Sequence, residues 1–98
     1  MYKIQLESSY FPAQTDANIR DISVGELLRE VASSHPNSVA MVDVSEDGES
    51  GQSWSYADLF NQAEQLAQAL VSRFEPRERV VVWAPNIPEW IFMEYAAG

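Results

Sequence analysis

The chain has 98 residues, enough for one small domain, and 46% of them are hydrophobic, which excludes disorder as the default interpretation. Fifteen acidic and six basic residues give a net charge of -9, which argues against binding to nucleic acid or to anionic membranes, because both need patches of Lys and Arg. The absence of cysteine excludes a disulfide framework and a zinc–thiolate site. No apolar run approaches a membrane span or the core of a signal peptide, so we expect neither.

The first helix is predicted after a polar, irregular lead-in over residues 1–20. It begins at Ser23, because Ser23 and Glu26 form an S-x-x-E capping box. The helix is predicted to stop at His35-Pro36, since the residue before a proline avoids the α region. Its apolar face consists of Leu27, Leu28, Val31 and Ala32.

A hairpin is predicted next. Residues 39–44 are predicted to form a strand, residues 45–52 a turn or loop that contains two glycines, and residues 53–55 a short antiparallel strand. Asp43 lies within the first strand, where it is either a carboxylate held at a site or an outward-facing side chain of an edge strand. The acidic run Glu46-Asp47-Gly48-Glu49 lacks the spaced ligands of an EF-hand and is interpreted as a solvated turn.

The second helix has the strongest pattern. Ser55 is predicted to cap it with Asp58 at the third position, and Pro76 is predicted to end it. Its wide apolar stripe requires a partner, which we expect to be a sheet. The stripe consists of Leu59, Phe60, Ala63, Leu66, Ala67, Leu70, Val71 and Phe74. The basic turn that follows, Arg77-Glu78-Arg79, is either solvated or a docking spot for a phosphate or another domain.

Residues 80–83 are apolar at every position, which predicts a parallel strand covered on both faces. Asn86 is predicted to cap a third helix, with Pro88 in its first turn and Glu89 completing an N-x-x-E box. This helix is apolar around most of its circumference and is expected to be buried, and Gly98 is predicted to be its C-cap. We therefore expect the chain to be part of something longer, or to associate.

Residues that could carry chemistry are few. His35 is predicted to be a helix-terminal residue rather than a catalytic one, and no phosphate-binding glycine pattern occurs. The turn Ala84-Pro85-Asn86 follows a predicted strand, where ligands bind in open α/β sheets, but Asn86 is interpreted as a helix cap rather than a ligand contact. No catalytic, cofactor-binding or metal-binding residue is predicted.

Three stretches nevertheless carry a resemblance. The runs Trp54-Ser-Tyr-Ala-Asp-Leu59 and Arg79-Val-Val-Val-Trp-Ala-Pro-Asn-Ile-Pro-Glu-Trp90, with Ser23-Val-Gly-Glu-Leu-Leu28 upstream, resemble the amino-terminal region of adenylate-forming enzymes. The second run resembles the acyl-CoA synthetase branch of this superfamily more than its adenylation domains. These are framework motifs of the family and not its catalytic signatures.

The resemblance implies an α/β fold, in which this single incomplete domain is part of the amino-terminal subdomain of an AMP-forming acyl-CoA synthetase. Its helices would pack on a mixed sheet with one buried parallel strand. The parent enzyme would join a carboxylic acid to CoA through an acyl-adenylate, with ATP, Mg²⁺ and CoA as cofactors. The absence of cysteine separately fits a cytoplasmic location. This segment would hold none of these cofactors, because the sole lysine is Lys3 and the family's phosphate loop and acidic motif have no counterpart. The remainder of the same chain would be its partner.

Two other hypotheses stay open. The chain could be a freestanding acidic α/β module that binds a protein partner through its apolar last helix. It could also be a plain nucleotide-binding α/β domain, although the missing glycine fingerprint argues against this.

Overall fold

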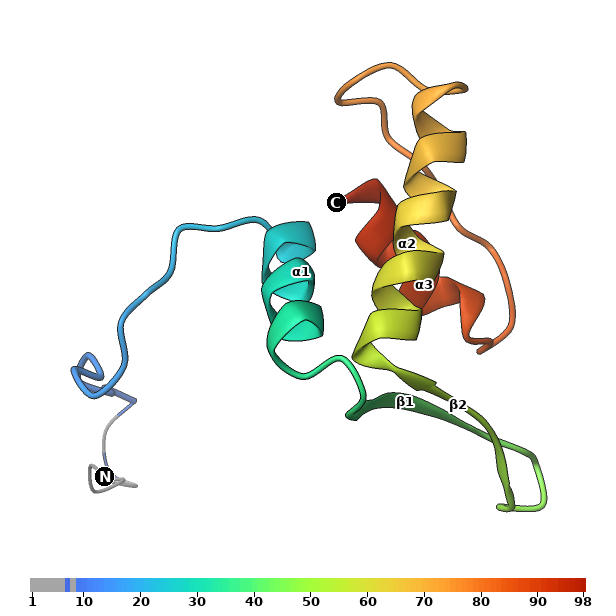
Figure 1. Ribbon diagram of the computed structural model, residues 1–98. Coiled ribbons are helices and arrows are strands. Elements are labelled where there is room, and N and C mark those ends of the chain that lie inside the picture. The colour runs from blue at the N-terminus through green and yellow to red at the C-terminus, as the bar shows by residue number, and fades with distance from the viewer. Residues whose placement is uncertain (1–6, 8) are drawn as a thin grey trace.

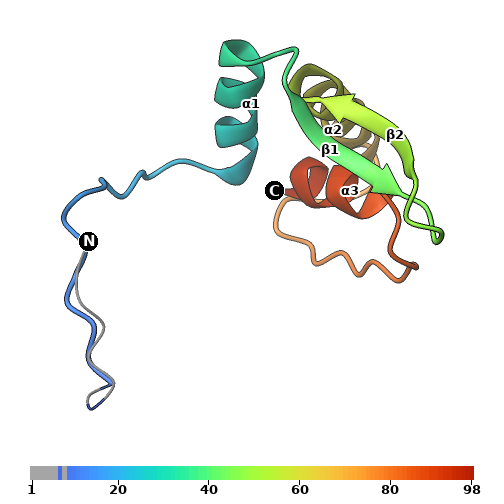
Figure 2. The same ribbon diagram turned by 90° about the horizontal axis from the view of Figure 1, so that it is seen from below.

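The computed structural model describes residue 7 and residues 9–98, and its regular elements are three helices and one hairpin (Figure 1). The order is α1 (Val24–Ser34), β1 (Val39–Val44), β2 (Ser50–Ser55), α2 (Tyr56–Val71) and α3 (Glu89–Ala97). In both views α2 and α3 lie side by side, while the lead-in before α1 runs away from them (Figure 2). None of the helices described is long and apolar enough to cross a membrane.

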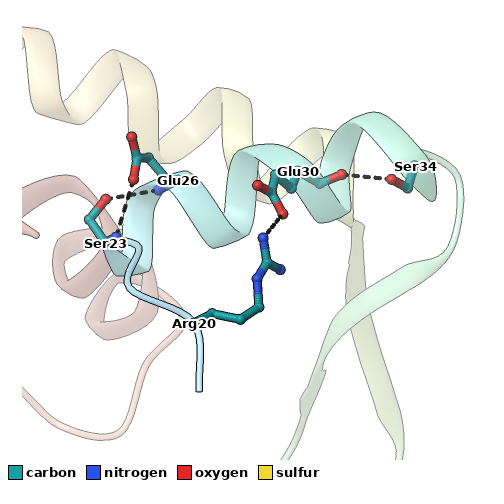
Figure 3. Close-up of polar contacts among 5 residues, drawn as sticks. All are labelled: Arg20, Ser23, Glu26, Glu30 and Ser34. Carbon is teal, nitrogen blue, oxygen red and sulfur yellow. Dashed lines mark hydrogen bonds and ion pairs between the residues drawn. The ribbon is translucent and has the colours of Figure 1, made fainter. Parts of the chain in front are cut away.

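Helix α1 begins as predicted. The Ser23 hydroxyl accepts a hydrogen bond from the backbone N–H of Glu26 at 3.1 Å, and the Glu26 carboxylate accepts one from the Ser23 N–H at 3.3 Å (Figure 3). An ion pair of 2.6 Å between Arg20 and Glu30 ties the lead-in to the helix. The helix ends at Ser34, and His35 is its C-cap. Both ends of this helix are thus set by residues beside it in the sequence.

The hairpin differs from the prediction in the length of its second strand. β2 begins at Ser50 rather than Ser53, and it pairs antiparallel with β1 with two register irregularities. Gly51 permits this close pairing, because a Cβ atom there would lie 3.1 Å from the backbone oxygen of Asp43. The turn is correspondingly shorter, and Gly48 has a φ of 80° within it. The sheet of the described residues is this antiparallel pair.

Helix α2 is capped as predicted but ends earlier than Pro76. Ser55 accepts from the Asp58 N–H at 3.1 Å, and Asp58 accepts from the Ser55 N–H at 3.0 Å. The helix stops at Val71, and the N–H groups of Arg73 and Phe74 both donate to the Leu70 carbonyl at 2.9 Å. This tightened last turn satisfies a terminal carbonyl before the chain reaches the proline.

In the segment between α2 and α3, one prediction is not confirmed and another is wrong. Residues 80–83 are not part of a sheet in this structure, so the predicted parallel strand is not confirmed. Asn86 does not cap α3: the N-cap is Pro88, and no side chain accepts a hydrogen bond there. The helix instead starts with the N–H groups of Trp90 and Ile91, which donate to the carbonyls of Ile87 and Pro88 at 3.2 and 3.0 Å. Gly98 is the C-cap, as predicted.

The core is small. Leu28, Leu59 and Ala63 form its buried centre, and Trp54 packs edge-on against Phe92 of α3 with ring centroids 5.7 Å apart. The chain exposes 8748 Å², whereas a compact protein of 11.0 kDa is expected to expose about 5,600 Å². Its radius of gyration is 17.8 Å against about 13 Å for a compact chain of this length. Exposed large hydrophobic side chains, among them Val71, Val81 and Trp83, account for part of this surface.

Candidate functional site

The structure brings together two polar residues that the sequence singled out separately. Asp43 on β1 and Asn86 in the turn before α3 line one hollow of about 320 Å³. The other residues that line the hollow are all apolar: Met41, Val42, Val44, Ile87, Pro88 and Ile91. Asp43 and Asn86 are both exposed, so their polar atoms stay accessible to water rather than being held in a dry site. This makes the hollow a weak candidate for chemistry, because reactive groups are usually tuned by burial.

The turn at Ala84–Pro88 is fixed by a side chain that sequence reasoning did not assign to it. The indole N–H of Trp90 donates to the carbonyl oxygens of Pro85 at 2.8 Å and of Ala84 at 3.2 Å. These carbonyls are thereby occupied within the turn. The signal was present as an aromatic donor in the first turn of the next helix, but only the folded geometry shows which acceptors it reaches.

His35 and the acidic turn lie where the sequence placed them. His35 is exposed at the end of α1, and its backbone N–H donates to the Val31 carbonyl at 2.8 Å. Asp47 accepts hydrogen bonds from the Ser45 hydroxyl and from the Glu49 N–H, and these bonds, the first above all, lower the pKa of its carboxyl group. The acidic turn is thus exposed and bonded to itself, and nowhere in the described ranges do three His, Cys, Asp or Glu residues gather as metal ligands.

The basic turn borders a hollow of about 650 Å³. The end of α2, the following loop and the end of α3 form it, and its lining includes Leu70, Phe74, Arg77, Val80 and Ala97. Arg77 has a φ of 71°, the left-handed region that non-glycine residues rarely adopt. Glu75 and Glu78 share the rim with Arg77, so the charge there is mixed and does not favour an anion.

Among residue 7 and residues 9–98, no polar or charged residue is buried, and no buried polar side-chain atom lacks a hydrogen-bond partner. Lys3, the sole lysine, lies outside the described residues. A nucleophile paired with a buried base, the usual arrangement for covalent catalysis, is not among these residues. The described residues instead expose apolar side chains around helices α1 and α2, which both start with capping boxes.

Comparison with known proteins gives two kinds of match. The sequence model of a family described as AMP-binding enzyme matches residues 28–97. Triostin synthetase I of Streptomyces triostinicus is 35% identical over 74 residues, covering 74% of this chain and 13% of that protein. The mitochondrial medium-chain acyl-CoA ligase ACSF2 of Danio rerio is 27% identical over 94 residues, covering 95% of this chain and 15% of that protein. No solved structure matches the chain. The chain thus spans less than a sixth of the length of either relative.

Proposed function

Because the chain belongs to the AMP-binding enzyme family, we propose that it is the amino-terminal structural part of an ATP-dependent, AMP-forming acid–CoA ligase. The observation that carries this proposal is the family match, which runs from the middle of α1 to the end of α3. The whole enzyme would convert a carboxylic acid and ATP to an acyl-adenylate and then to an acyl-CoA. The chain would be a single incomplete domain of that enzyme.

The described residues do not fit the cofactors of such a reaction. ATP and Mg²⁺ supply an activated phosphoryl group and a cation that stabilises its charge. A nucleotide site needs free, phosphate-facing N–H groups, yet at the start of α3 the N–H groups of Trp90 and Ile91 already donate to the carbonyls of Ile87 and Pro88. Arg77 borders the hollow at the opposite, C-terminal end of α3, where Glu75 and Glu78 also line it. We therefore assign this segment a supporting role and derive no chemical step from it.

In this supporting role, the segment would provide apolar surfaces against which the remainder of the enzyme packs. Along residues 79–83 burial alternates between exposed and half-buried, as expected for a strand with one covered face. We propose that residues 80–83 become the predicted parallel strand once neighbouring strands are present. A cytoplasmic location stays a prediction, and the ligase relative from Danio rerio is named as mitochondrial.

The test begins with the product of the natural gene. Its intact mass is measured first, and a mass several-fold above 11.0 kDa is expected. That protein is then assayed for acid-dependent pyrophosphate release with ATP and Mg²⁺, using a panel of carboxylic acids that includes medium-chain fatty acids. Mass spectrometry of the products distinguishes CoA from an acyl carrier protein as the acceptor.

The chain alone serves as the matched control and is expected to release no pyrophosphate. Activity in this chain alone would contradict the supporting role. A native mass near 11.0 kDa together with a cooperative melt would contradict the ligase proposal and favour the freestanding interaction module.

A further inference from the structure

The turn between β1 and β2 contains the one Asp-Gly pair of the sequence, Asp47-Gly48. The turn lies at the outer end of the hairpin, away from the helices (Figure 1), and both residues of the pair are exposed. The residues beside the pair are charged or polar, so the turn offers no apolar surface for further chain to bury. Water therefore reaches the peptide bond between Asp47 and Gly48.

Hydrogen bonds hold the Asp47 side chain against the backbone that follows it. Its Oδ1 atom accepts from the Glu49 N–H at 3.1 Å and also from the Ser45 hydroxyl. The first bond closes an Asx-turn, which keeps the carboxyl carbon Cγ on the side of the Gly48 nitrogen. Gly48 has a φ of 80°, and no other part of the described chain lies within 4 Å of the place that a Cβ atom would take there. The nitrogen of this glycine is thus unshielded by a side chain.

We propose that the Asp47–Gly48 peptide bond is a modification site, at which the chain rearranges spontaneously to an isoaspartyl bond. The Gly48 nitrogen bonds to Cγ of Asp47, and the hydroxyl of the protonated carboxyl group leaves as water with the N–H proton. The product is a five-membered succinimide ring. Water then opens the ring at either carbonyl carbon. Opening at Cγ restores aspartate, whereas opening at the former backbone carbonyl leaves Gly48 joined through the Asp47 side chain. The steps need no oxidant or reductant, and the chain keeps its mass.

Two features of the folded turn make the rearrangement slow at neutral pH. The Gly48 N–H donates to the Ser45 carbonyl at 2.9 Å, so this bond has to open before the nitrogen can attack. The hydrogen bond from the Ser45 side chain, and then the one from the Glu49 backbone, lower the pKa of the Asp47 carboxyl group. A carboxylate is a poorer electrophile than a protonated carboxyl group, so mildly acidic solution favours the reaction.

The rearrangement would add one carbon atom to the main chain inside a tight turn. The Ser45 N–H donates to the Glu49 carbonyl at 3.0 Å across this turn, and the pairing of Val44 with Ser50 follows directly. The side-chain carboxylate that accepts from the Glu49 N–H would also be lost, because its carbon becomes part of the main chain. The expected damage is therefore confined to the turn and the adjacent end of the hairpin.

The test ages the full chain in buffer at about pH 5, closer than neutral pH to the ordinary pKa of an aspartyl carboxyl group. Samples are digested with an endoproteinase that cleaves before aspartate but not before isoaspartate, and the peptides are identified by mass spectrometry. We expect cleavage before residue 47 to be lost progressively, with an intermediate that is lighter by one water molecule.

Two other aspartates serve as internal controls. Asp43 is followed by Val44 within β1, and Asp16 is followed by Ala17 in the exposed lead-in. Cleavage before both is expected to persist, and Asp16 shows what exposure does without a following glycine. Hydrogen exchange of the backbone amides over residues 42–53 follows the hairpin in the same samples, and we expect protection to fall as isoaspartate accumulates.

A variant separates the role of the glycine from the conformation of the turn. Gly48→Asn keeps a residue that tolerates positive φ, but it places a side chain beside the attacking nitrogen. We expect it to reduce the loss of cleavage at residue 47 to the level seen at Asp16. Hydrogen exchange before ageing shows whether the variant keeps the hairpin.

Three outcomes would overturn the proposal: no isoaspartate at residue 47, equal formation at Asp16 and Asp47, or an undiminished rate in Gly48→Asn. Equal formation would make exposure, rather than the glycine, the cause. The inference goes beyond the proposed function and concerns one bond of the hairpin. Its failure would not affect the ligase proposal, which depends on the mass and products of the natural protein.

Discussion

The two halves of the structure differ in how their elements are held. From Ser23 to Val71, each helix starts with a complete capping box, and the hairpin joins them through backbone pairing. From Ser72 to Ala97, the extended segment is unpaired and α3 begins without a side-chain cap. The buried residues follow the same division, since all of them lie in the first half. The first half is specified by short-range contacts, and the second by surfaces that need a partner.

The two halves still touch, and the contact is aromatic. Phe92 of α3 meets Trp54 of β2, while Ile91 and Tyr95 pack on the buried centre around Leu59. α3 is therefore docked by its side chains rather than by a local hydrogen-bonding signal at its start. A change in the first-half core should consequently loosen the second half, whereas changes at the start of α3 should have little effect.

The largest effect is expected from Leu59→Ala. Leu59 is 4% exposed at the centre of the core, and removing its branched side chain leaves a cavity. The free energy of unfolding is expected to fall by about 2–5 kcal/mol, measured by urea denaturation. Val71→Ala, at a residue 80% exposed on the same helix, is the control and should change it by less than about 0.5 kcal/mol. Equal losses would mean that the buried centre does not stabilise the fold.

A smaller loss of stability should distinguish α2, which starts with a capping box, from α3, which starts without a side-chain cap. Ser55→Ala removes the acceptor for the Asp58 N–H and is expected to cost about 1 kcal/mol. Asn86→Ala is expected to be nearly neutral, because Asn86 does not cap α3. Thermal melts of the two variants measure the difference. An equal loss of stability in both variants would indicate that Asn86 caps α3 after all, as the N-x-x-E pattern predicted.

Arg77→Gly tests the loop between the halves and is expected to stabilise the chain. Arg77 has a φ of 71°, which is unfavourable for a residue with a side chain and neutral for glycine. Glycine relieves this strain in the folded state, but it also gives the unfolded chain more conformational entropy. The net effect should raise the free energy of unfolding by about 0.5–1 kcal/mol. Arg73→Gly, at the tightened end of α2, is the matched control and should destabilise. A loss for Arg77→Gly would show that the guanidinium group makes a stabilising contact.

The smallest effect is a pH dependence of the α2 cap. The backbone N–H of Ser55, and then its side chain, lower the pKa of the Asp58 carboxyl group. A carboxylate whose pKa is lowered by folding stabilises the protein above its unfolded pKa, and this contribution is lost as the pH falls below about 4. The stability difference between the wild type and Asp58→Asn should therefore shrink from pH 6 to pH 2. A constant difference over that range would contradict a role for the charged form.

The sequence predicted what neighbouring residues determine. Ser23 with Glu26, and Ser55 with Asp58, close hydrogen-bonded rings over three positions, so the pattern alone identified both helix starts. The same pattern at Asn86 and Glu89 failed, because Trp90 binds the carbonyls of Ala84 and Pro85 and the helix begins after Pro88. Hydrogen bonds from an aromatic side chain just beyond the capping pattern thus accompany the loss of the predicted cap.

Non-local features were the ones that sequence reasoning missed. The extension of β2 to Ser50 depends on the approach of Gly51 to the Asp43 backbone, which no local pattern encodes. Asp43 and Asn86 were considered separately, and only folding places them on one hollow. The apolar run at 80–83 predicted a parallel strand, which is not confirmed, because strand pairing requires neighbours that the sequence pattern does not contain.

The three tryptophans give the molecule a graded set of optical probes. Trp54 is 9% exposed, Trp90 37% and Trp83 97%, and each reports on a different event. Trp54 senses the docking of α3 through Phe92, Trp90 the turn that its indole holds, and Trp83 the exposed segment before α3. Single-tryptophan variants with phenylalanine at the other two positions would let acrylamide quenching follow these events separately. A refolding experiment could then time the capture of α3 after the capped helices and the hairpin have formed.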